Sequence, residues 1–77
     1  MPATTRTLYA LRTSTGRLAI LALTPDDDPW LEGVRYVREY LARDEYLAAI
    51  APATARDVAV VRATGGNVPE GQAASSS

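Results

Sequence analysis

Two apolar runs near the N-terminus predict a β-hairpin. The first run, Thr7 to Thr13, is followed by Ser14-Thr15-Gly16, and a second run extends from Arg17 to Thr24. Both runs contain strand-favouring residues, and a loop of this length suits a hairpin with a bulge or a type I turn. Glycine adopts the positive φ of such a loop without steric cost. We therefore predict two antiparallel strands joined at Gly16.

Neither strand shows the alternation of a sheet with one face in water. Leu8 and Ala10 would lie on one face of the first strand, with Tyr9 and Leu11 on the other, and Leu18 to Leu23 is apolar throughout. A strand with one solvated face alternates apolar and polar residues. We expect the second strand to be central, with helices on one face of the sheet and another surface against the other.

The strongest helical signal begins at Asp28. Asp28 is a good N-cap and Pro29 suits the first helical position. One face of the helix then carries Trp30, Val34, Val37 and Leu41. We predict a helix from Pro29 to about Arg43, with Trp30 as a core anchor.

The remaining pattern predicts a helix, a strand and a tail. The apolar phase breaks after Arg43, so a second short helix would start at Asp44 as N-cap, run to about Ala51 and stop at Pro52. Asp57 to Ala63, with three valines, predicts the third strand, and residues 66–77 have the composition of a disordered tail.

These elements predict a single α+β domain over residues 1–65. It would have a three-stranded, mainly antiparallel sheet, two helices on one face and the order β-β-α-α-β, followed by a disordered tail over 66–77. A domain of about 60 residues buries little surface and usually needs a staple or a partner. Because the chain has no cysteine, we expect self-association as a homodimer, or an obligate complex.

Composition narrows the chemistry. The chain has no Cys and no His, which excludes disulfides, thiolate or imidazole metal sites and histidine acid/base pairs. Its apolar stretches, such as Leu18 to Leu23, are far shorter than the roughly 20 residues of a membrane-spanning helix. The first residues lack the order of a secretory signal. We expect a cytoplasmic protein with no membrane segment.

The acidic residues between the hairpin and the first helix are the one dense group of carboxylates: Asp26, Asp27, Asp28 and Glu32. Their spacing does not match an EF-hand loop, and acids at a helix N-terminus complement its dipole. No hydroxyl has a histidine to activate it as a nucleophile. We therefore expect no catalysis, no cofactor and no metal.

A glycine and two tyrosines in the first helix suggest a contact surface. Tyr36 and Tyr40 lie one turn apart, and Gly33 lies beside them on the helical wheel. A helical glycine costs up to about 1 kcal/mol unless something uses the missing side chain. Either a partner rests on Gly33 and is held by the tyrosines, or this flank packs on the domain's own sheet. With Tyr9 and Leu11 on a sheet face, these residues form the predicted partner-binding set.

Charge distribution leaves nucleic-acid binding as the alternative. Residues 1–24 hold Arg6, Arg12 and Arg17 and no acid, whereas residues 25–51 hold seven acids against three arginines. A β-ribbon with arginines can enter a major groove. The pI near 5.2 is unlike the basic excess of most nucleic-acid binders. Attraction within the fold would explain the same segregation.

One stretch of the chain, Leu8 to Ile50, contains a turn at Gly16, then Leu-Ala-Ile-Leu-Ala-Leu, Thr-Pro-Asp and Trp30-Leu-Glu. This stretch is similar in pattern to the hairpin-and-helix half of the Phd/YefM-type antitoxins. We expect two differences from that family. The helical segment that those proteins use to bind DNA is lacking ahead of the hairpin, and a third strand replaces their toxin-wrapping tail. The resemblance implies a small bacterial or phage regulatory protein. We expect a non-catalytic protein-interaction or regulatory module.

Overall fold

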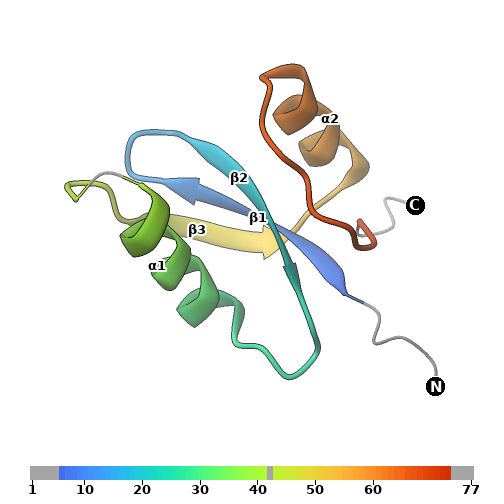
Figure 1. Cartoon of the computed structure of the whole chain (residues 1–77), viewed down its shortest axis with the longest axis horizontal. Helices are drawn as coiled ribbons and strands as arrows, with labels where there is room; N and C mark the ends of the chain where they lie inside the picture. The colour runs from blue at the N-terminus through green and yellow to red at the C-terminus, as the bar shows by residue number, and fades with distance from the viewer. Residues whose placement is uncertain (1–5, 42, 74–77) are drawn as a thin grey trace.

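The computed structural model describes residues 6–41 and 43–73, which form three strands and two helices (Figure 1). In chain order these are β1 (Thr7–Thr13), β2 (Leu18–Leu23), α1 (Pro29–Tyr40), β3 (Leu47–Pro52) and α2 (Ala55–Ala63). The strands make one antiparallel sheet with the order β2-β1-β3. The predicted α+β class, with three antiparallel strands and two helices, is confirmed. The central strand, however, is β1, and β2 lies at an edge.

The hairpin forms at the predicted turn. Gly16 has φ +86° and donates its N–H to the Thr13 carbonyl at 2.9 Å. The Thr13 N–H donates to the Arg17 carbonyl at 3.0 Å and closes the loop. Gly16 and Arg17 thus both lie opposite Thr13. Two residues opposite one, the first a glycine with positive φ, are the geometry of a glycine bulge.

The predicted order of the last two elements is wrong. The chain runs β-β-α-β-α, because residues 47–52 form a strand and residues 55–63 form a helix. The alanine-rich stretch 47–52 fills the second edge of β1, and the Ala53 N–H continues that pairing to the Leu8 carbonyl at 2.8 Å. Pairing with an open strand edge outweighs the weak helix preference of a short alanine run.

A capping box starts α2. Thr54 accepts from the Asp57 N–H, and the Asp57 carboxylate accepts from the Thr54 N–H. Val58 and Val61, one turn apart, are the buried residues of this helix. Their spacing of three residues suits a helix face rather than a strand face.

The two helices lie on opposite faces of the sheet, so the prediction of both on one face is wrong (Figure 1). On one face, Leu11 packs with Val37 of α1 and Leu47. On the other, Leu8 and Ile20 pack with Val58 and Val61 of α2. The helix α2 is therefore the surface that covers the second apolar face of the hairpin. This arrangement removes one of the reasons for expecting self-association.

The two helices cover different strands of the sheet. Helix α1 packs mainly on β3 and β1, whereas α2 packs on β2. Asp28 caps α1 as predicted, accepting from the N–H groups of Trp30 and Leu31. Trp30 is 50% exposed, so its predicted role as a core anchor is wrong, and Val37 is the buried residue of that face.

Residues 66–73 return along the start of β1 instead of forming the disordered segment that their composition predicted. The Gln72 N–H donates to the Arg6 carbonyl, and the Leu8 N–H donates to the Gln72 carbonyl, each at 2.9 Å. Val68 and Ala73 pack against the core cluster that contains Leu8. Residues 74–77 of that prediction lie outside the described residues.

Candidate interaction site along the β2 edge

The outer edge of β2 carries the backbone groups that point away from β1. Thr13 and Arg17, which close the hairpin loop, form a hydrogen-bonded pair. From there along the β1–β2 register, non-hydrogen-bonded and hydrogen-bonded pairs alternate. The N–H and C=O groups of Leu18, Ile20 and Ala22 therefore point away from β1. No other strand of the described chain pairs with this side of β2.

The two sheet edges differ in how they are protected. On β3, Pro52 lies opposite Tyr9 and has no N–H to offer, and the register shifts beside Arg12. Proline, charge and bulges are the devices that stop an edge from pairing with another chain. Strand β2 contains six apolar residues with no proline, no charge and no register shift. It is the edge that remains open to pairing.

A groove of about 500 Å³ follows this edge. Ile20, Leu21 and Ala22 contribute to it from β2. One wall is formed by Tyr36 and Tyr40 of α1, and the other by residues 67–69, which follow α2. Because α1 and α2 lie on opposite faces of the sheet, the walls border the edge from both faces. A space of this form suits a single added strand.

The tyrosines are the exposed aromatic part of this groove. Their ring centroids are 5.2 Å apart with an interplanar angle of 40°. Tyr40 is 70% exposed and Tyr36 is half-buried. Aromatic side chains at a partly wet position supply contact area at small entropic cost, as they do in interface hot spots. The structure thus brings two of the predicted partner-binding residues to the β2 edge.

Gly33 does not lie with them on the surface. It is buried, and a Cβ built on it would come within 2.8 Å of the Leu47 side chain and 3.3 Å of the Ile50 side chain. The close approach that this glycine permits is to the domain's own β3. Of the two interpretations left open by the sequence, packing on the sheet is the one that the structure shows for Gly33.

The other two predicted partner-binding residues lie in or near the core. Leu11 is fully buried beneath α1, so it offers no surface to a partner. Tyr9 is half-buried in the middle of the sheet, between Leu21 on β2 and Pro52 on β3. Neither residue lines the groove.

The three arginines of the nucleic-acid alternative do not form one patch. Arg6 precedes β1 and lines the groove, whereas Arg12 and Arg17 lie at the opposite end of the hairpin. At about 3.3 Å per residue, β1 separates Arg6 from Arg12 by about 20 Å. Arg17 is also paired with an acid, Glu45, at 3.5 Å.

Glu45 is a buried carboxylate that sequence reasoning missed. Its side chain is 2% exposed, and one oxygen accepts from the hydroxyls of Thr13 (2.8 Å) and Thr15 (2.7 Å). These contacts fasten the hairpin turn to the segment before β3. The sequence pattern predicted that Glu45 lies in the first turn of a helix, where its side chain would be on the surface. Its partners are donors 30 and 32 residues away, and no local pattern identifies them.

The acidic residues after β2 accept hydrogen bonds from neighbouring residues of the chain. Asp27 accepts from the N–H and hydroxyl of Thr24, and Asp28 caps α1. Among the described residues, no group of three or more metal-ligating side chains could hold an ion.

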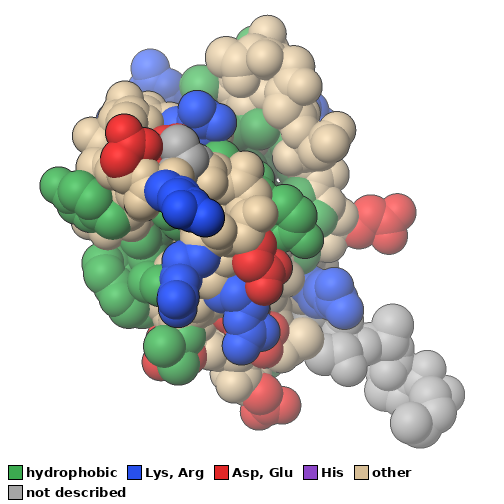
Figure 2. Space-filling view, turned by 60° about the vertical axis from the view of Figure 1, so that its left-hand side comes forward, with side chains coloured by type: hydrophobic (Ala, Val, Ile, Leu, Met, Phe, Trp, Pro, Cys, Tyr) green, Lys and Arg blue, Asp and Glu red, His purple; other side chains and the backbone are tan. Residues whose placement is uncertain are grey.

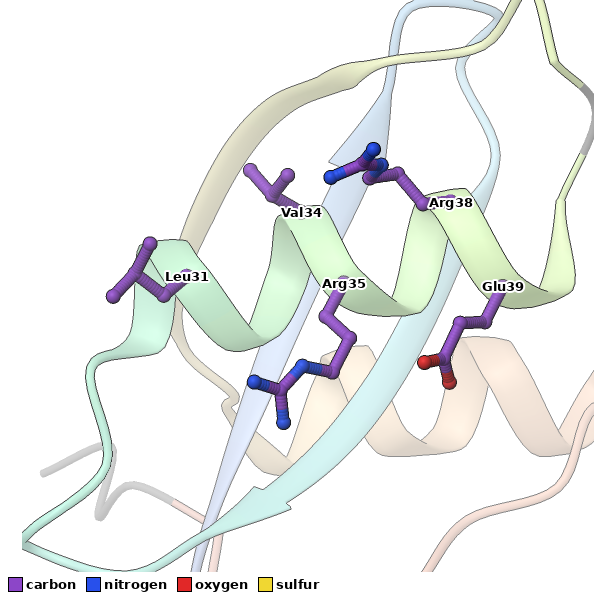
Figure 3. A pocket seen from close by; sticks show the side chains of 5 residues that line it. All are labelled: Leu31, Val34, Arg35, Arg38 and Glu39. Atoms are coloured by element: carbon purple, nitrogen blue, oxygen red, sulfur yellow. The ribbon is translucent and has the colours of Figure 1, made fainter.

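A second depression lies on the outer surface of α1 (Figure 3). Arg35 and Glu39 extend to one side of the helix axis, and Leu31, Val34 and Arg38 to the other. The space-filling view that brings this region forward shows cationic and anionic side chains mixed, with apolar ones beside them (Figure 2). Since all five lining residues come from one helix, this is a surface between side chains, not an enclosed site.

Comparison with known proteins identifies no relative: no protein-family model, no curated protein and no solved structure matches the chain. The likeness to Phd/YefM-type antitoxins stays a prediction. Neither helix in the described ranges is long and apolar enough to cross a lipid bilayer.

Proposed function

We propose that this protein is a non-catalytic interaction module that binds an extended segment of another protein along β2. The observation that carries the proposal is the open outer edge of β2, bordered by the two tyrosines. An added strand would bond to the outward groups of Leu18, Ile20 and Ala22, and its alternate side chains would meet the two walls of the groove. Main-chain bonds supply affinity in such complexes, and the walls supply selectivity.

The role of Tyr36 and Tyr40 follows from their place. They stand beside Leu21 on the α1 side of the sheet. Helix α1 packs mainly on the other two strands. An incoming apolar side chain would bury part of the Tyr40 ring, which is 70% exposed.

A single substitution can remove the edge without disturbing the sheet. Ala22 pairs with Leu8 in a non-hydrogen-bonded position, so Ala22→Pro deletes only an outward N–H. Pro52 already occupies the equivalent outward position on β3. Ala22→Val is the matched control, because it adds similar bulk and keeps the N–H.

The test is selection of linear peptides from a displayed random library by the purified full chain, followed by affinity measurement of the selected peptides. We expect apolar, strand-forming peptides that bind the parent protein and Ala22→Val but not Ala22→Pro, with NMR shifts centred on the amides of β2. Failure to enrich any peptide, or equal binding to Ala22→Pro, would contradict the proposal. The amide spectrum of Ala22→Pro checks that the variant is folded.

A further inference from the structure

We infer that the occupant of the β2 edge is an extended segment of a different protein that places an acidic group beside Arg6. This inference rests on the proposed function and specifies the partner. It is carried by three features: the charge of the groove, the surroundings of that charge, and what a second copy of the chain would bring to the same place.

Arg6 is the only charged residue among the described residues that line the groove. Its side chain is exposed, and no ion pair joins it to an acid within residues 6–41 and 43–73. The remaining lining is apolar, aromatic or amide. A ligand that follows the groove therefore meets one positive charge, which no ion pair holds in the described ranges.

The register places that charge at one end of the edge. Thr7 pairs with Leu23, so Arg6 lies near the C-terminal end of β2. On the α1 side of β2 lie Glu32, which pairs with Arg35 at 3.7 Å, and Glu39. They line an adjoining groove, while Arg6 lines the groove that Asn67, Val68 and Pro69 border. On the other side Glu70 follows Pro69, and no ion pair joins it to Arg6 in the described ranges.

A second copy fits this charge poorly. An antiparallel two-fold pairing centred on Ile20 would use all three outward positions of both strands, with Leu18 opposite Ala22. The same register brings Arg17 and the hairpin turn of the second copy to this end of β2. Arg17 would lie on the α1 face of the sheet, where Glu45 pairs with it, whereas Arg6 lies on the other face. Residues 13–17 include no acid, so a second copy brings no acidic partner to Arg6. An acidic group in that position would instead gain a favourable contact.

Defined peptides test the inference. The probes are four blocked peptides of alternating valine and threonine, carrying either one aspartate or one lysine at either end. We expect one aspartate peptide to bind the full chain about threefold more tightly than its lysine counterpart, the size typical of an exposed ion pair. Arg6→Gln should abolish this preference and Arg6→Glu should reverse it.

Arg12→Gln is the matched control, because Arg12 is an exposed arginine at the other end of β1 and does not line the groove. It should leave the preference unchanged. Raising the salt concentration should weaken the preference in the parent protein, since exposed charges are screened.

The outcomes separate this inference from the proposed function. If no peptide binds, or if all bind Ala22→Pro equally well, the proposed function fails. If Ala22→Pro abolishes binding but Arg6→Gln keeps the charge preference, only the present inference is overturned. A concentration-dependent dimer in sedimentation that Ala22→Pro dissolves would make a second copy the occupant, and would also overturn it.

Discussion

The Thr13 hydroxyl and the Glu45 carboxylate, 32 residues apart in the chain, are joined by a buried hydrogen bond of 2.8 Å. Thr13 is 2% exposed and Glu45 is 8% exposed. A hydrogen bond to a charged group contributes more than one between neutral groups. This bond joins the hairpin turn to the segment that leads into β3, so its loss should be felt across the sheet.

Thr13→Val should lower the free energy of unfolding by about 1.5–3 kcal/mol, because it keeps the side-chain shape and deletes a donor to a buried carboxylate. Urea denaturation monitored by Trp30 fluorescence would measure the change. Thr15→Val removes the second donor at a more exposed position and should cost less. Equal stability of Thr13→Val and the parent protein would contradict a stabilising role for the bond.

Gly33→Ala should destabilise the protein by about 1 kcal/mol. Alanine gains up to about 1 kcal/mol in helix propensity, but its Cβ would press on the buried Leu47 side chain at 2.8 Å, and overpacking costs about 1–3 kcal/mol. Gly33→Leu should cost more and reduce folding itself.

A double-mutant cycle with Leu47→Val checks this explanation by thermal unfolding. Shortening Leu47 removes the atoms that the new Cβ would meet, so the cost of Gly33→Ala should shrink in the Leu47→Val background. Strictly additive costs would mean that the contact with Leu47 does not limit this position.

Truncation after Gly66 should destabilise the protein by about 1–3 kcal/mol. It removes the Gln72 carbonyl that accepts from the Leu8 N–H, together with the packing of Val68 on the core. Hydrogen exchange of the Leu8 amide should quicken. Truncation after Ala73 is the control and should leave both quantities unchanged; an equal effect of the two truncations would argue against the docking of residues 67–73.

Thr54→Ala should cost about 1 kcal/mol, because Thr54 is the N-cap of α2 and half of its capping box. Thr54→Ser keeps the hydroxyl and should recover most of the loss. Chemical denaturation compares the three proteins. If residues 55–63 formed a strand, as their valines first indicated, neither substitution would show this order.

Local signals in the sequence determined the hairpin and the start of the first helix. Gly16 and the Asp28-Pro29 pair act within a few residues, so their geometry is the same whatever the rest of the chain does. The apolar character of both hairpin faces was also readable, and it correctly required cover on each side. The Thr54–Asp57 capping box was a readable signal too, although the valines after it favoured a strand.

Only the tertiary structure decided where each element pairs and what it covers. The run 47–52 became a strand because β1 had a second edge to fill, and Val58 and Val61 became a helix face because Leu8 and Ile20 needed cover. The open edge of β2 follows from that strand order, since placing β1 in the centre leaves β2 with one partner strand in the described part of the chain. Pairing and burial depend on residues distant in the chain, and no short segment encodes them alone.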